Sequence, residues 1–182
     1  TIIALIKHQN VVLPERRVEL YEVALKTLIP SWNLARSLGP RPTGEAQPRT
    51  EITRAIWAPV AYWMHAEVGR EVSRSRLHGK LVGVLTADFD KTEFEAQEIA
   101  ESYLQAAAET SGLLEARGPN TFAFVHQSFQ EYLAALHLAR PPSKAAAKIA
   151  SRADDPRWAE IIRLAAGHLG ITLGEREILA EV

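Results

Sequence analysis

His126 stands at a junction in the sequence where an imidazole could contact an anion. The preceding run Thr121–Val125 is typical of a β-strand, and Ser128 opens a helix with the capping pattern Ser-x-x-Glu. Backbone N–H groups at a helix N-terminus attract anions, and a neighbouring histidine can add a hydrogen bond to a phosphate. From the spacing alone we favour a plainer interpretation, in which His126 ends a hairpin and packs against its own helix.

Other polar residues suggest chemistry less strongly. Asp88 and Asp90 flank Phe89, and paired acids can bind a metal or act as general acid and base. Because they precede a helix cap, we interpret them as solvated loop acids. Asp154 and Asp155 precede Pro156, where capping and the helix dipole explain them.

The remaining histidines do not form a zinc motif. None of the six is part of the i, i+4 pair with an intervening Glu that binds zinc on a helix, and most are expected to pack at the surface or at helix edges. The six are His8, His65, His78, His126, His137 and His168. We therefore predict no metal site and no catalytic residue.

Several enzyme signatures are missing from the sequence. It contains no phosphate-binding loop, no dinucleotide glycine fingerprint and no nucleophile elbow. It also contains no cysteine, which excludes disulfides, thiolate zinc sites and cysteine nucleophiles, and favours an intracellular protein. No apolar run approaches the roughly 20 residues that span a bilayer, and no signal peptide is evident. The chain alone is predicted to be neither an enzyme nor a holder of its own cofactor.

The charge pattern argues against DNA as the main partner. The formal net charge is −1 and the pI is about 6.6. Arg70, Arg74 and Arg76 form a loose cluster, but Arg117 is the only basic residue of the expected hairpin. The helix after His126 contains no Lys or Arg from residue 127 to 139, whereas a DNA-reading helix needs such donors. A DNA-binding winged-helix regulator therefore stays an alternative that we do not favour.

Composition and periodicity predict a mainly α protein. The 182 residues include 28 alanines and 20 leucines, both strong helix formers. An apolar stripe at helical spacing begins after Pro14, and Pro30 within it is expected to kink or end that helix. Residues 39–48 are expected to form a loop, and Thr50 to cap the next helix, with a bend at Pro59.

The second half of the chain is predicted to contain one β-hairpin among helices. Ser73 is expected to cap one helix, and Thr92–Glu95 forms a capping box for the next. Residues 113–117 and 121–125 predict the two strands of the hairpin. The helix that Ser128 opens should end at Pro141-Pro142, and a last helix should begin at Pro156. The fold class is thus a helical bundle containing a winged-helix-like unit.

The ends of the chain suggest a segment of a longer protein. The first residue is Thr1, the only methionine is Met64, and the apolar residues near the start are typical of the tail of a helix. Residues 175–182 are typical of a helix without its cap.

Three segments together resemble NACHT-family signal-transducing NTPases, the family that includes NOD-like receptors. Phe124–Ala135 has the winged-helix pattern of an aromatic residue, an apolar residue, His, any residue, Ser or Thr, then Phe-Gln-Glu and an aromatic. Residues 3–22 are similar to the helix pair that follows the nucleotide-binding core of bacterial NACHT proteins. Gly112–Glu115 resembles the entry to their winged helix.

The resemblance implies a regulatory role in a larger ATPase switch. In this family a winged-helix histidine contacts the phosphate of bound ADP, and that residue corresponds to His126. Phe129, Tyr132 and Leu133 would then be core residues of its helix. Nucleotide and Mg²⁺ would be held by residues outside this sequence. The implied partner is the upstream nucleotide-binding domain, with homo-oligomers forming on activation.

Three parts follow from this interpretation. Residues 1–38 form a helical segment after the nucleotide-binding core, 50–140 the winged-helix-like domain, and 141–182 a C-terminal helical segment. The expected location is the cytoplasm. Besides the DNA-binding regulator, a stand-alone helical adaptor that binds a protein partner stays open.

Overall fold

The computed structural model describes residues 17–36, 46–109 and 112–172. Helices dominate this part of the chain, and a small antiparallel sheet completes it. The elements in chain order are α2 (Arg17–Arg36), α3 (Ala46–Trp63), the π-helix η1 (Met64–Val68), β1 (Glu71–Ser73), α4 (Arg74–Asp88), α5 (Glu93–Glu109), β2 (Leu114–Gly118), β3 (Thr121–Phe124), α6 (Gln127–Leu138), α7 (Pro142–Ala150), the 3-10 turn η2 (Pro156–Trp158), α8 (Ala159–Gly167) and the π-helix η3 (His168–Thr172).

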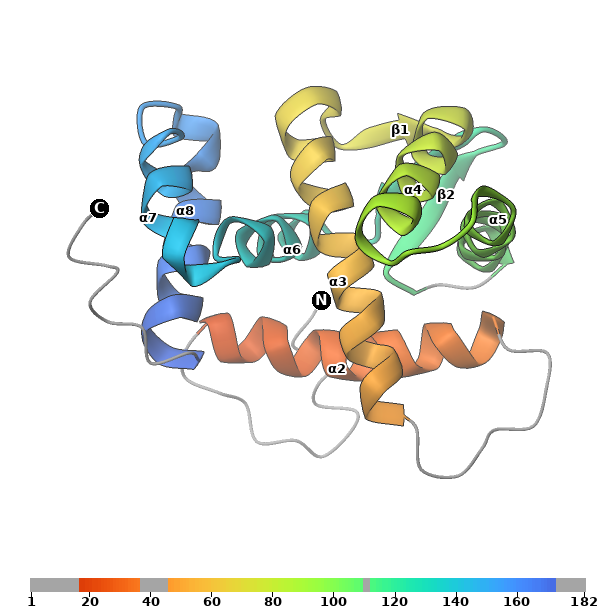
Figure 1. Ribbon diagram of the computed structural model, residues 1–182, viewed down its shortest axis with the longest axis horizontal. Coiled ribbons are helices and arrows are strands. Elements are labelled where there is room, and N and C mark those ends of the chain that lie inside the picture. The colour runs from red at the N-terminus through yellow and green to blue at the C-terminus, as the bar shows by residue number, and fades with distance from the viewer. Residues whose placement is uncertain (1–16, 37–45, 110–111, 173–182) are drawn as a thin grey trace.

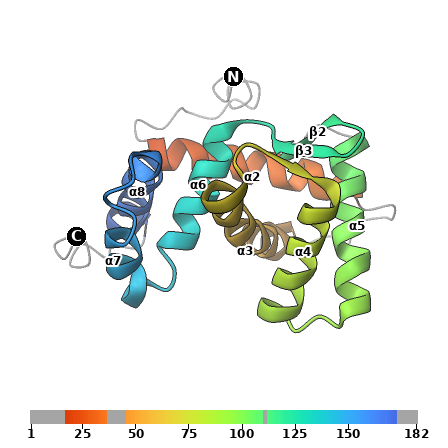
Figure 2. The same cartoon turned by 90° about the horizontal axis from the view of Figure 1, so that it is seen from above.

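The helices are arranged around α3 and α6, which lie in the middle of the molecule. Figures 1 and 2 show α4, α5 and the sheet at one end, and α7 and α8 at the other. Helix α2 runs along one side and crosses α3 (Figure 1). The buried side chains form one continuous core through these elements. The predicted fold class, mainly α with a winged-helix unit, is therefore confirmed.

The winged-helix unit has the order α3–β1–α4–α5–β2–β3. Its sheet has the strand order β1-β3-β2, and both pairings are antiparallel. Val72 pairs with Phe122, and Ala116 pairs with Phe122 from the other side. The predicted hairpin is confirmed, with its strands within one residue of the expected positions.

Strand β1 was not predicted from the sequence. It has only three residues, of which Val72 alone is buried, so no alternation is visible in the sequence. It forms because the backbone of β3 is available for antiparallel pairing on this side. Ser73 is the N-cap of α4, as predicted, but its side chain makes no capping hydrogen bond.

One of the two predicted capping boxes is present. Thr92 Oγ1 accepts from the N–H of Glu95 at 3.3 Å, and the Glu95 carboxylate accepts from the N–H of Thr92 at 2.9 Å. The prediction of a second box at Ser128 is wrong, because α6 begins at Gln127 and His126 is its N-cap. Glu131 instead accepts from the Gln127 side chain at 2.7 Å.

Helix boundaries near prolines also differ from the prediction. Helix α2 continues through Pro30 to Arg36, and α3 begins at Ala46, before Thr50 and inside the expected loop. Pro59 lies inside α3 as predicted, and the helix continues to Trp63. An interior proline costs a helix about 3 kcal/mol, and around Pro59 the burial of Ala58 and Val60 helps to offset this cost. The helices expected near both chain ends lie outside the described residues.

The centre of the core is Trp57 on α3. Its ring is completely buried and meets the rings of Tyr103 at 5.4 Å and Phe124 at 6.1 Å, both edge-on. Burying an aromatic side chain of this size contributes several kcal/mol. This cluster joins α3, α5 and β3, and thereby fixes the end of the hairpin from which His126 emerges.

Aromatic rings also join the C-terminal helices to this unit. Trp158 is buried, and the rings of Tyr62 and His65 lie 5.1 Å and 4.7 Å from it. The guanidinium of Arg152 lies over the Trp158 ring at 4.8 Å and donates to the Tyr62 hydroxyl at 2.8 Å. Such cation–π contacts stabilise by roughly 0.5–2 kcal/mol.

At Gly167, α8 lies close to α2. A Cβ atom at this position would lie 2.7 Å from Cγ2 of Val18, which is itself buried. The branched valine side chain is stiff and cannot turn away from its helix. The absence of a side chain at Gly167 therefore allows the two helices to pack.

We predict that Gly167→Ala lowers the free energy of unfolding by about 1–2 kcal/mol. The added methyl overpacks the contact with Val18, and overpacking costs typically 1–3 kcal/mol, more than the gain of up to about 1 kcal/mol in helix propensity. Urea denaturation followed by circular dichroism measures the difference.

Gly83→Ala is the matched control. Gly83 is exposed on α4 and has nothing within 4 Å of its Cβ position. This substitution should stabilise the protein by roughly 0.5–1 kcal/mol. Equal stabilisation by both substitutions would contradict the close α2–α8 contact.

Candidate functional site

His126 occupies the two-residue step between β3 and α6. Its backbone is extended (φ −145°, ψ 134°), and its carbonyl accepts from the N–H of Phe129 at 3.0 Å. The N–H of Val125 donates to the Leu113 carbonyl at 3.1 Å, which ties this step to the start of the hairpin. The His126 side chain is exposed, and the edge of its ring faces Phe129 at 6.5 Å.

The hydrogen bonding of the His126 ring determines which nitrogen faces outward as a donor. Nδ1 accepts from the N–H of Ser128 at 3.3 Å, so the imidazole itself caps the helix. In a neutral ring with Nδ1 as acceptor, the proton is on Nε2. Because Nε2 is on the opposite edge of the ring from Nδ1, its N–H donor lies on the side of the ring away from the N–H of Ser128. The geometry can bind one oxygen of an anion.

Helix α6 is held rigidly behind this histidine. Phe129, Tyr132 and Leu133 are all at least 98% buried, which confirms their prediction as core residues. The Gln130 side chain, also buried, donates to the carbonyl of Gly69 at 3.0 Å just after η1. The first turn of α6 is thus fixed against its neighbours on both sides.

A buried ionic cluster joins α6 to α2 and α3. Arg54 is 94% buried and donates to both carboxylate oxygens of Glu22, at 2.9 Å and 3.3 Å. The Tyr132 hydroxyl donates to Oε2 of Glu22 at 2.6 Å. Arg54 also donates to the exposed Glu51 at 3.0 Å. Sequence reasoning missed this cluster; the one signal was an arginine beside the apolar face of its helix.

The charged state of the cluster is well defined. Burial raises the pKa of Glu22, but the Tyr132 hydrogen bond and the charges of Arg54 and Lys26 outweigh that effect and hold this pKa below its usual value. Burial and the adjacent Glu22 carboxylate raise the pKa of Tyr132, which stays protonated. Removing one partner of such a buried pair costs about 3–5 kcal/mol, because the other charge is left uncompensated.

Three further histidines are parts of the fold. The ring of His65 contacts the Arg157 carbonyl at 3.0 Å, and that of His137 lies 4.7 Å from the ring of Tyr62. His168 is 98% buried, and neither ring nitrogen has a hydrogen-bond partner. The expected edge packing describes His65 and His137; His168 is more deeply buried than predicted. His8 lies outside the described residues.

The acidic residues named from the sequence do not form a metal site. Asp88 and Asp90 are exposed, as predicted for solvated acids. Asp155 caps η2 by accepting from the N–H of Arg157 at 3.0 Å, which confirms its capping role. Within residues 17–36, 46–109 and 112–172, no three His, Cys, Asp or Glu side chains gather closely enough to hold a metal ion.

The topology identifies a different helix as the one that would read DNA. In a helix-turn-helix the second helix enters the major groove, and here that helix is α5 and not α6, the helix that follows His126. Helix α5 contains five glutamates and no Lys or Arg. Phosphates would be repelled from this surface, so the structure gives DNA binding no support.

In the part of the chain that the structure describes, no helix is long and apolar enough to cross a membrane.

Comparison with known proteins gives one family match. The model of a family described as "Winged helix-turn-helix domain C-terminal to NACHT" matches residues 17–138. These residues include α2, the winged-helix unit and all of α6, with His126 at its start. No curated protein and no solved structure matches this chain significantly.

We predict that acid destabilises the fold through its buried histidines. Burial lowers the pKa of His65 and His168, and burial together with Lys148 lowers that of His137 to about 4. These rings stay neutral in the folded state but take up protons near pH 6.5 when unfolded. The unfolded state therefore binds more protons, and the free energy of unfolding falls as the pH drops below about 6.5.

His137→Gln tests the largest of these contributions. Each pKa unit corresponds to about 1.4 kcal/mol. Allowing for the partial exposure of the ring, the loss of stability between pH 7 and pH 4.5 should shrink by roughly 1–2 kcal/mol in the variant. Urea denaturation at the two pH values measures this difference. An unchanged difference would show that His137 does not contribute.

Proposed function

The chain belongs to the family of winged helix-turn-helix domains that lie C-terminal to NACHT, and from this premise we propose that it is the regulatory region of a NACHT-type signal-transduction ATPase. Its role is to sense whether ADP or ATP occupies the upstream NACHT domain and to relay that state by moving as a body. The observation that carries this proposal is the position of His126, exposed at the N-terminus of a helix whose other side is fixed in the core.

His126 is proposed to donate Nε2–H to a phosphate oxygen of ADP. Its Nδ1 is engaged by the N–H of Ser128, which orients the ring and leaves Nε2 as the outward donor. The dipole of α6, whose N-terminus His126 caps, would add a favourable potential for an anion near the ring. His126 would contribute one hydrogen bond, while the NACHT domain would make most of the contacts with the nucleotide.

Relay follows from the rigidity of the elements behind His126. The Glu22, Arg54 and Tyr132 cluster joins α6 to α2 and α3, and Trp158 joins α3 to the C-terminal helices. Gain or loss of the phosphate contact would therefore shift these elements together as a rigid body. Interfaces of this kind have discrete arrangements, which suits a two-state switch.

Catalysis is assigned to the NACHT domain and not to this chain. We propose that nucleotide and Mg²⁺ are held by that domain, which supplies the phosphate chemistry. The chain contributes one hydrogen-bond donor and the positioning of that donor. Cytoplasmic location and homo-oligomers on activation belong to the same proposal.

We predict that His126→Ala raises the off-rate of ADP about tenfold or more in a protein that joins a NACHT domain to this chain. A hydrogen bond to a charged phosphate contributes about 1.5–3 kcal/mol, and its loss should also raise basal activity. Release of a fluorescent ADP analogue measures the off-rate. Unchanged ADP release together with unchanged oligomerisation would contradict the proposal.

His126→Asn separates phosphate binding from helix capping. Asparagine is a good N-cap, so this variant should keep the stability that alanine loses, about 1 kcal/mol. It should still release ADP as fast as the alanine variant, because its shorter side chain does not reach the phosphate. His78→Ala, on α4, should leave ADP release unchanged.

A further inference from the structure

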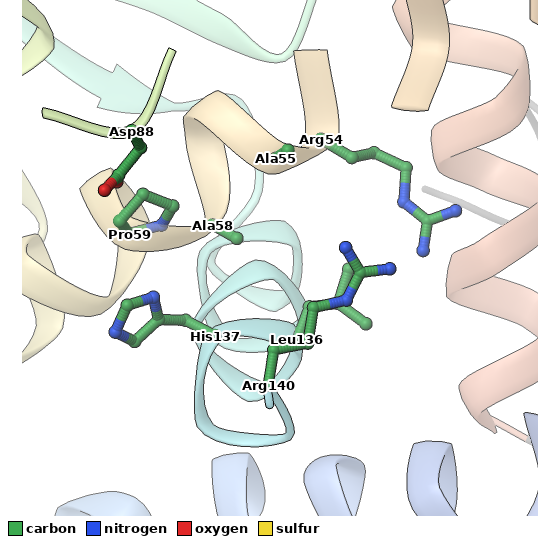
Figure 3. A pocket seen from close by; sticks show the side chains of 8 residues that line it. All are labelled: Arg54, Ala55, Ala58, Pro59, Asp88, Leu136, His137 and Arg140. Atoms are coloured by element: carbon green, nitrogen blue, oxygen red, sulfur yellow. The ribbon is translucent and has the colours of Figure 1, made fainter. Parts of the chain in front are cut away.

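A small pocket lies at the opposite end of α6 from His126. It opens between α3 and the last turn of α6, and its volume is about 140 Å³. Ala55, Ala58 and Pro59 of α3 and Leu136 of α6 form its apolar wall. Figure 3 shows the charged and aromatic side chains arranged around this wall. Of the lining residues, Arg54 also belongs to the cluster behind His126, and the others have no part in the His126 site.

The charges around the pocket are separated by sign. Figure 3 shows the guanidinium groups of Arg54 and Arg140 together on one side, and Asp88 on the other. Neither Arg140 nor Asp88 makes a side-chain hydrogen bond or salt bridge with any described residue. An unpaired cation and an unpaired anion therefore face one small pocket from opposite sides.

Arg54 does not supply a free donor to the pocket. Its two terminal nitrogens are engaged by Glu22 and Glu51. Its Nε–H has no partner, but that atom is closed off from solvent, so a molecule in the pocket does not reach it. Arg140 is therefore the cation that stays available to a ligand.

The proline in α3 leaves an acceptor at the pocket. Pro59 has no N–H, so the carbonyl of Ala55, one turn earlier, lacks its helical donor. Both residues line the pocket. His137 lies on the same side as Asp88, and because burial holds its pKa at about 4, it stays neutral near pH 7. Figure 3 shows Ala55 beside Arg54, and Asp88 and His137 on the opposite side.

The volume limits the size of the ligand. A protein cavity of about 150 Å³ holds benzene, which has six heavy atoms. The pocket is therefore too small for a nucleotide and matches a molecule of about six heavy atoms. Alanine, with a carboxylate, an ammonium group and one methyl, has this size.

We propose that this pocket binds a small zwitterionic amino acid. The carboxylate would accept from Arg140, and the ammonium group would lie toward Asp88. The methyl group would contact Ala58 and Leu136. This proposal does not depend on nucleotide contact at His126, and either can fail without the other.

Titration of the 182-residue chain with L-alanine, at constant ionic strength, tests the proposal. We expect saturable changes in the amide NMR signals of residues near the pocket, with a dissociation constant on the order of 1 mM. Arg140→Gln should weaken binding about tenfold. Butyrate has the same carboxylate and size but no ammonium group, so it should bind several-fold more weakly than alanine.

Asp88→Asn distinguishes a zwitterion site from a simple anion site. It should weaken alanine binding several-fold and leave butyrate binding unchanged, because only alanine carries the ammonium group. Arg140 and Asp88 are exposed, so both variants should keep the fold. Arg117→Gln and Asp154→Asn, at exposed positions outside the pocket, are the matched controls and should bind alanine as the unmodified chain does.

Ala55→Leu fills the pocket without changing any charge and should abolish binding. Absence of saturable shifts, or alanine binding that survives both Ala55→Leu and Arg140→Gln, would overturn the proposal. Tighter binding of inorganic phosphate or butyrate than of alanine would also overturn it.

Discussion

The buried ion pair of Arg54 and Glu22 is the interaction on which the arrangement of the central helices depends. It holds α2 to α3, and the hydroxyl of Tyr132 extends it to α6. Arg54 is buried and Glu22 is partly buried, so a packing of the three helices that separates these partners would be destabilised. Around this cluster the core is apolar and depends on size and shape, with Trp57 in the middle and Gly167 where α8 lies close to α2.

This constraint gives His126 its significance. His126 lies at the surface at the end of the hairpin, and the helix that it caps is held by the ionic cluster. The hydrogen bond from the N–H of Ser128 orients the exposed ring. The same helix ends at Leu138, two residues before Arg140, which lines the small pocket between α3 and α6. A helix held in its middle by an ionic cluster thus presents one polar group at each end, and the two can be used independently because they face different parts of the surface.

Much of the fold could be predicted from periodicity and capping, because helices and hairpins are local structures. Thr92 and Glu95, three residues apart, predict the start of α5, and the turn at 118–120 predicts the hairpin. Features that depend on distant residues could not be predicted. Strand β1 forms by pairing with β3, in which Phe122 is the partner of Val72. Helix α2 continues past Pro30, and the N-cap of α6 is His126 and not Ser128. The same distinction applies to the site residues. His126 could be predicted because it lies in a local sequence pattern. Arg54 and Glu22 are 32 residues apart, and no pattern connects them.

The central claim is that the outward Nε2–H of His126 senses the nucleotide. The most direct test is the ¹⁵N NMR spectrum of the His126 ring in a protein that joins a NACHT domain to this chain, recorded without nucleotide, with ADP and with ATP. The account predicts a proton on Nε2 in the free protein, a shift of the Nε2 signal when ADP binds, and loss of that shift when ATP replaces ADP. A proton on Nδ1 in the free protein, or an Nε2 chemical shift that does not change when ADP binds, would contradict it.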